Sequence, residues 1–141
     1  MNTAPCLAAA LFALAGCSDF PRDPDGTLKR VEAAGVIRLG VVSGAAREPA
    51  ADAAVGHLAA RTGARVMRVP GQGEELLEAL EDGKLDLVYG HFSDDSPWAA
   101  KVHFSAPPAG PDTPPKSQRA ARFAFKAGEN GWITAVEDAA P

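Results

Sequence analysis

The stretch Val36-Ile37-Arg38-Leu39-Gly40-Val41-Val42 decides the fold of this chain. It is rich in β-branched residues and predicts a buried strand. Two further strands are predicted at 65–69 and 85–90, and helices at 50–62 and 74–81 separate the three strands. Strands that alternate with short-linked helices form right-handed crossovers and a parallel sheet. The sequence therefore predicts an α/β fold with a small, mostly parallel sheet that carries helices on both faces.

Shorter elements are expected on either side of this pattern. They are a helix at 27–35, a turn at 70–73, a helical turn at 96–100, an extended segment at 102–105, a strand at 122–125 and a helix at 130–139. Thr27 is expected to cap the first helix, and Gly35 to end it. With the strand at 122–125, the prediction is a three-layer domain of about four strands.

The N-terminal residues predict a targeting signal. An apolar run from Ala4 to Ala15 is too short to span a bilayer and ends in Leu14-Ala15-Gly16-Cys17, which is similar to a bacterial lipobox. The motif predicts a lipoprotein signal peptide at 1–16, a lipid on Cys17, a tether at 17–26 and a folded domain at 27–141. No Lys or Arg precedes Cys17, so a plain secretory signal with an incidental cysteine is the alternative.

This interpretation places the protein at the periplasmic face of a bacterial cell envelope, held to the membrane by its lipid. In many Gram-negative bacteria, an Asp at the position of Ser18 would favour retention in the inner membrane. Because Ser18 stands there instead, the sequence slightly favours the outer membrane. The formal net charge of −4 excludes the basic surface that nucleic acids need.

Few residues offer catalytic or metal chemistry. Both cysteines, Cys6 and Cys17, precede the folded domain, so no disulfide or cysteine metal ligand is expected there. His91 and His103, even with the Asp94-Asp95 pair, lack a recognised ligand spacing. No nucleophile motif and no phosphate loop is present. The sequence therefore predicts a protein that is not an enzyme, with no cofactor and no metal.

Four segments resemble the first lobe of bacterial extracellular solute-binding proteins of family 3, the amino-acid receptors of ABC importers. They are Leu28 to Val41, Glu75 to Val88, Val102 to Pro107 with its Phe-Ser-x-Pro pattern, and Phe125 to Trp132 with its Gly-Glu-Asn turn. The resemblance implies a lobe I fold and a non-catalytic, solute-binding lipoprotein. Its expected partners are a small polar solute and an ABC permease or another envelope protein.

The chain departs from that family in the place of the second lobe. Only the Pro-rich segment 106–118 stands where a second lobe would be inserted, and a single βαβ unit already needs about 30 residues. We therefore expect the second lobe to be absent. This departure supports an alternative function, a single-lobe interaction module that docks on an envelope transporter or enzyme without a small ligand.

Candidate ligand-binding residues follow from the edge at which such sheets bind ligands, beyond the carboxyl ends of the strands. Loops at that edge contribute Ser43, Arg47, His91, Ser93 and Asp94. In the family, the loop after the third strand supplies a hydroxyl, for which Ser93 is the candidate, and an Arg that binds the ligand carboxylate. That Arg is missing here, and Arg47 or Lys101 are its possible substitutes.

Overall fold

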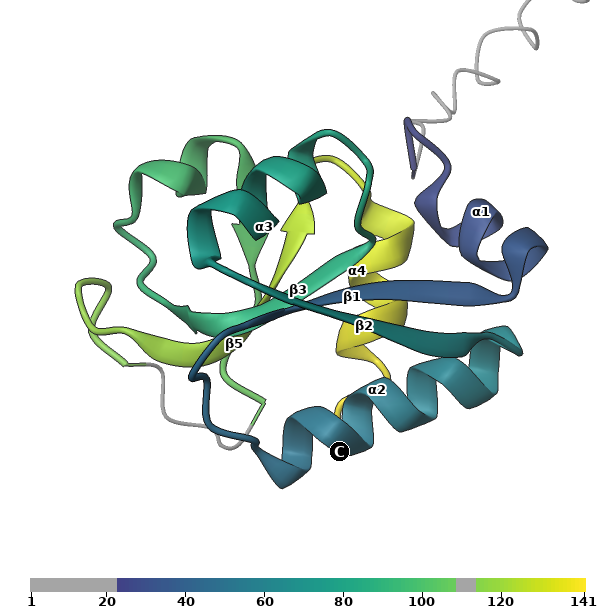
Figure 1. The fold of residues 1–141 in the computed structure, drawn as a ribbon, viewed down its shortest axis with the longest axis horizontal. Coiled ribbons are helices and arrows are strands. Elements are labelled where there is room, and N and C mark those ends of the chain that lie inside the picture. The colour runs from purple at the N-terminus through teal and green to yellow at the C-terminus, as the bar shows by residue number, and fades with distance from the viewer. Residues whose placement is uncertain (1–22, 109–113) are drawn as a thin grey trace, which may run out of the picture.

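The computed structural model describes residues 23–108 and 114–141 (Figure 1). The signal peptide expected at 1–16, Cys17 and the first part of the expected tether lie outside the described residues, as does the centre of the segment 106–118. No helix of the described part is long and apolar enough to cross a membrane.

The described residues form one five-stranded sheet with four α-helices. The strands are β1 (Val36–Val42), β2 (Arg65–Gly71), β3 (Leu87–Phe92), β4 (Val102–Phe104) and β5 (Ala120–Lys126). The helices are α1 (Thr27–Ala34), α2 (Pro49–Thr62), α3 (Gly73–Glu81) and α4 (Asn130–Glu137), with a 3-10 turn η1 (Pro97–Ala100). This confirms the expected α/β class and adds one strand to the expected four, because the extended segment at 102–105 pairs as β4.

The strand order is β2-β1-β3-β5-β4. β1 pairs in parallel with β2 and β3, whereas β5 runs antiparallel to both of its neighbours. Four strands therefore share one direction, and the sheet is mostly parallel, as predicted. β5 enters between β3 and β4, which places the chain's last strand inside the sheet and not at its edge.

Several predicted boundaries were wrong, and those of β2 and β3 bear on the site. Pro70 and Gly71, expected in a turn, extend β2 because β2 is an edge strand, where a proline removes no hydrogen bond that the sheet needs. β3 begins two residues later than expected and includes His91 and Phe92, which pair with Ala121 and Ala120 of β5. His91 is therefore a strand residue and does not belong to the loop that follows.

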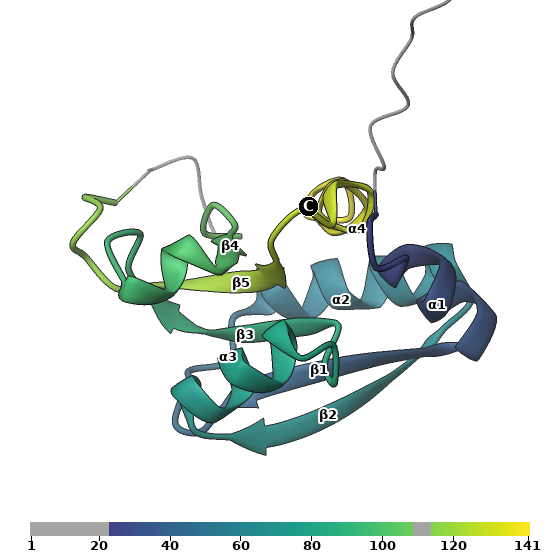
Figure 2. The ribbon, with the colours of Figure 1, turned by 90° about the horizontal axis from the view of Figure 1, so that it is seen from above.

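Helices cover both faces of the sheet, which gives the predicted three layers (Figure 2). α1, α2 and α4 pack on one face, where Leu58, Phe125 and Trp132 are fully buried. α3 and η1 cover the other face, where Leu80 and Val88 are fully buried. Gly63 ends α2 as predicted, and its φ of 67° is a left-handed conformation that glycine adopts without strain.

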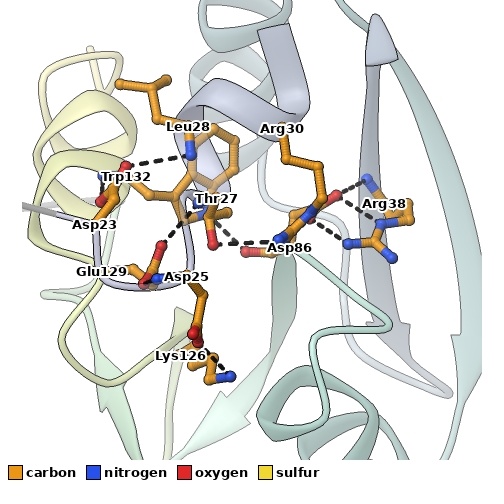
Figure 3. A network of polar contacts seen from close by, with 10 residues as sticks. All are labelled: Asp23, Asp25, Thr27, Leu28, Arg30, Arg38, Asp86, Lys126, Glu129 and Trp132. Carbon is orange, nitrogen blue, oxygen red and sulfur yellow. Dashed lines mark hydrogen bonds and ion pairs between the residues drawn. The ribbon is translucent and has the colours of Figure 1, made fainter. Parts of the chain in front are cut away.

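A buried carboxylate joins four elements beneath α1 (Figure 3). Asp86, immediately before β3, accepts hydrogen bonds from the backbone N–H of Arg38 at 2.8 Å and from its Nε at 3.0 Å and Nη2 at 2.7 Å. Arg30 of α1 donates to the same carboxylate at 2.9 Å. The Asp86 carbonyl oxygen accepts from Trp132 Nε1 of α4 at 2.6 Å. This arrangement ties α1, β1, β3 and α4 together.

The cap of α1 differs from the expected one. Thr27 makes no capping hydrogen bond with its side chain. Instead, buried Glu129 accepts from the N–H groups of Asp25 at 2.7 Å and Thr27 at 2.8 Å. Asp23 accepts from Leu28 of α1 at 3.2 Å and from Trp132 of α4 at 3.0 Å (Figure 3). Carboxylates from outside the helix therefore satisfy its first N–H groups. Asp23 is a local cap, five residues before Leu28, whereas Glu129 lies 102 residues from Thr27, which local sequence cannot reveal.

Candidate functional site

The candidate site lies at one edge of the sheet. The carboxyl ends of β1 and β3 meet there, since Val41 pairs with Tyr89, and the amino end of β5 joins them through the pairing of Phe92 with Ala120. Two loops leave this edge, one leading from β1 to α2 and one from β3 to η1. In open α/β sheets, this is the edge at which ligands bind.

A cavity of about 290 Å³, here called the α2 cavity, opens between the first turns of α2 and the sheet. Its floor is apolar and includes Leu39, Val55 and Phe123, whereas Arg47, Glu48, Asp52, Arg68 and Tyr89 supply its polar groups. An apolar pocket with a few convergent polar groups is the usual form of a small-molecule site. This volume suits a solute about the size of an amino acid.

Charges of both signs meet at the mouth of the α2 cavity. Asp52 accepts from Arg47 Nε at 3.2 Å and Nη2 at 2.9 Å, and its second oxygen lies 3.5 Å from Arg68 Nη2. Arg47 and Arg68 are largely exposed. Exposed pairs of this kind contribute little to stability, so these side chains can exchange partners at little cost.

Tyr89 reaches the α2 cavity from β3. Its hydroxyl donates to the Ala46 carbonyl oxygen at 3.2 Å, which anchors the loop between β1 and α2. Burial, with the carboxylates of Glu48 and Asp52, raises the pKa of the Tyr89 phenol to about 12. The phenol therefore stays protonated at neutral pH and acts as a hydrogen-bond donor.

A second hollow, here called the β3 cleft, lies at the end of β3 and has a volume of about 310 Å³. His91, Ser93, Asp95, Ser96 and Arg119 contribute its polar groups, beside Phe92 and Pro97. Arg119 Nε and Nη2 donate to the His91 carbonyl oxygen at 3.1 and 3.0 Å. This cleft is more polar and more open than the α2 cavity.

A buried arginine stands beside the β3 cleft. Arg122 lies on β5 with only 2% of its surface exposed, and its Nη1 donates to the Asp94 carboxylate. Its Nε and Nη2 atoms are buried and have no hydrogen-bond partner within the described residues. Within the described residues, the Asp94 carboxylate is therefore the hydrogen-bond acceptor of the Arg122 guanidinium.

The structure places four of the five predicted ligand residues in three separate locations and leaves Ser43 apart from them. Arg47 lines the α2 cavity, His91 and Ser93 line the β3 cleft, and Asp94 pairs with Arg122. Ser43 is exposed and lines neither hollow, and its N–H donates to the Gly71 carbonyl oxygen at 2.9 Å.

Of the two cations considered for the missing arginine, Lys101 lies elsewhere. Its Nζ is 3.1 Å from Glu81 of α3 and 5.4 Å from the ring centre of Trp98. The two histidines considered as metal ligands are also separated, since His91 pairs with Ala121 of β5 whereas His103 of β4 pairs with Phe125, four residues further along β5. Across residues 23–108 and 114–141, no three His, Cys, Asp or Glu side chains are placed to hold a metal ion.

Sequence reasoning missed four further residues at this edge. The patterns around Arg68 and Tyr89 predict strands but do not indicate that these side chains reach a cavity. The same holds for Asp52, which lies in the first turn of α2. Arg122 carried the one usable signal, because a charged residue inside the apolar run from Ala120 to Phe125 is unusual for a central strand.

No family model and no curated protein matches the sequence. Solved structures do match the fold. The arginine-bound form of domain 1 from TmArgBP, of T. maritima, superposes with a TM-score of 0.59 at 16% identity, covering 78% of this chain and 94% of that one. A point mutant of the same domain gives a TM-score of 0.61 at 16% identity, with coverage of 79% and 94%.

An ancestral cationic amino acid solute-binding protein matches with a TM-score of 0.57 at 13% identity, again covering 79% of this chain and 94% of that one. These likenesses show that the described residues have the fold of a periplasmic binding protein lobe. The TmArgBP structure is domain 1 of that protein, and 94% of it is covered by this chain, so the two folds have a similar extent.

Proposed function

We propose that this chain is a non-catalytic, solute-binding-type domain that holds a small polar solute in the α2 cavity. The observation that carries this proposal is an amino-acid-sized cavity at the carboxyl edge of the sheet, with Arg47, Asp52 and Arg68 at its mouth. A lobe fold shared with an arginine-bound domain and with a cationic amino acid binding protein supports the proposal.

The charges favour a zwitterionic solute. A solute carboxylate would bind Arg47 or Arg68, and a solute ammonium would bind Asp52, replacing one exposed ion pair by another. The apolar floor would hold the middle of the molecule, and the Tyr89 hydroxyl oxygen, whose proton goes to the Ala46 carbonyl, could accept a hydrogen bond from it. Ser43, His91, Ser93 and Asp94 do not line the α2 cavity and are proposed as contacts for a solute elsewhere on the same edge. We propose no chemical step, since binding alone explains these groups.

The test is thermal unfolding of the full chain in the presence of amino acids, polyamines and small organic acids. A solute that binds only the folded state adds about 2.7 kcal/mol at 100 times its dissociation constant, because mass action draws the equilibrium toward the folded protein. We therefore expect at least one zwitterionic compound to raise the melting temperature by several degrees. A cooperative transition that none of the compounds moves would refute the small-solute proposal.

A pair of arginines on β2 provides the matched control. Arg68→Ala is expected to weaken binding of the active compound about tenfold, since it removes a charged contact worth about 1.4 kcal/mol. Arg65→Ala is expected to change binding little, because exposed Arg65 does not line the cavity. Equal effects of the two substitutions would place the solute elsewhere.

The second candidate function is that of an interaction module docked on an envelope protein. The observation in its favour is the edge strand β2, on which Met67 is 41% exposed beside Arg65 and Arg68. An exposed strand edge can pair with a strand of a partner. A melting transition unaffected by small solutes, together with a stabilising partner such as an ABC permease, would favour this function.

We further propose that the chain is a lipoprotein of the bacterial envelope, linked to an ABC importer and held at the outer membrane by a lipid on Cys17. The support is the Leu14-Ala15-Gly16-Cys17 motif. When the chain is made in a Gram-negative host, we expect it to partition into the detergent phase of a Triton X-114 extract. Cys17→Ser is expected to shift it to the aqueous phase because no thiol remains to carry the lipid.

Cys6→Ser is the control for this experiment, since Cys6 lies within the apolar run and outside the motif. It should partition as the natural chain does. If Cys17→Ser stays in the detergent phase, or if the natural chain is aqueous, the lipoprotein proposal fails and the plain secretory signal is favoured.

A further inference from the structure

The starting observation is the buried guanidinium of Arg122. A guanidinium has five N–H donors, and burying a charged group without partners is costly. Arg122 satisfies Nη1 with Asp94, whereas Nε and Nη2 have no partner within the described residues. The side chain therefore presents more donors than the surrounding chain uses.

Asp94 stands between this guanidinium and solvent. Its side chain is 31% exposed although that of Arg122 is only 2% exposed. It belongs to the loop between β3 and η1, and its neighbours Ser93 and Asp95 both line the β3 cleft. A turn of the Asp94 side chain toward solvent would leave Arg122 Nη1 without its acceptor, beside the loop whose residues Ser93 and Asp95 line the cleft.

The other charged groups around the cleft have both signs. Arg119 lies at its wall and donates to the His91 carbonyl oxygen, while Asp95 adds a carboxylate that is exposed to solvent. Without Asp94, the two arginines would outnumber the single carboxylate, and an anion would be favoured. With Asp94 in place, the charges balance.

We propose that Arg122 forms a carboxylate-binding site that Asp94 fills from within the chain, and that a small carboxylate solute binds there by displacing Asp94. The flat, two-pronged guanidinium matches a carboxylate, which can accept from two nitrogens at once. The inference goes beyond the proposed function, because it places a carboxylate solute at the loop after β3 and not in the α2 cavity. It does not depend on the α2 cavity.

The tethered carboxylate sets the affinity of such a site. A group held by a short loop competes at an effective concentration on the order of millimolar or higher. A solute carboxylate must therefore displace Asp94 and binds weakly to the natural chain. Removing the Asp94 carboxylate should strengthen binding of a simple carboxylate at least tenfold.

The experiment measures the melting temperature of the full chain in sodium acetate, with sodium chloride keeping the ionic strength constant. Asp94→Ala is expected to melt below the natural chain and to recover several degrees in roughly 100 mM acetate, a concentration within the range of weak anion sites. The natural chain and Asp95→Ala should respond by about one degree or less. Asp95 is the matched control, since it is an adjacent carboxylate that does not pair with Arg122.

A double variant, Asp94→Ala with Arg122→Leu, tests the role of the arginine and should lose the acetate response. The proposal is overturned if Asp94→Ala responds no more than Asp95→Ala, or if the double variant still responds. Should Asp94→Ala fail to fold without acetate, Asp94→Asn, which keeps the shape of the side chain, gives the same comparison. Because the probe is acetate, a failed solute panel would refute the α2 cavity and leave this result standing.

Discussion

Replacing Asp86 with asparagine is expected to lower the free energy of unfolding by about 3 to 5 kcal/mol, the usual cost of breaking a buried ion pair. The side chain of Asp86 is 1% exposed and accepts hydrogen bonds from both Arg30 and Arg38. An asparagine is neutral and its amide nitrogen would face these donors, so two guanidinium groups lose their counter-charge at once. Urea unfolding of the variant measures the loss.

Asp82→Asn is the matched control. Asp82 also pairs with a cation, Lys84 at 2.9 Å, but both side chains are exposed to water. Ion pairs between fully exposed side chains contribute little to stability, so this variant should unfold almost as the natural chain does. A loss at Asp86 no larger than the loss at Asp82 would show that the buried carboxylate does not hold α1 and β1 together.

The same variant should change the response to acid. Burial by itself would raise the pKa of the Asp86 carboxyl, but hydrogen bonds from Arg38 and Arg30 outweigh it and keep that pKa below its usual value. A carboxyl whose pKa is lower in the folded protein stabilises it above the unfolded pKa of about 3.9, and this contribution is lost as the pH falls through the folded pKa. The difference in stability between the natural chain and Asp86→Asn should therefore narrow below about pH 4.

Glu129→Ala is expected to cost about 3 kcal/mol. Its carboxylate, 1% exposed, accepts from the N–H groups of Asp25 and Thr27, and hydrogen bonds to a charged group contribute about 1.5 to 3 kcal/mol each. The Thr27 N–H is buried and would find no water in place of the lost acceptor, whereas Asp25 is exposed and could be hydrated. Urea unfolding again measures the effect.

Glu129→Gln should lose less than Glu129→Ala, because the amide oxygen keeps one acceptor. Glu32→Ala, an exposed position in the middle of α1, should change stability by no more than about 0.5 kcal/mol. If Glu129→Ala proves as mild as Glu32→Ala, the N-terminus of α1 is held by its own residues and the carboxylate caps of Figure 3 contribute little.

From the sequence, the candidate site could be located only to one edge of the sheet. The strand pattern located the carboxyl ends of β1 and β3, and Arg47, His91 and Ser93 do line hollows there. The sequence could not separate the α2 cavity from the β3 cleft, because that depends on which face of the sheet each loop leaves. Nor could it pair Arg122 with Asp94, since these residues are 28 positions apart and meet only when β5 inserts beside β3.

Local chemistry determined the elements of this protein. The β-branched run at 36–42, the apolar faces of the helices and the glycine after α2 act over a few residues, and each element that they predict is present. Only the tertiary structure decided which contacts join those elements to one another. The cap of α1 by Glu129 and the pairing of Asp86 with two arginines join residues between 48 and 104 positions apart. Burial gives such contacts their strength, and burial exists only once the sheet and its two helical layers have assembled.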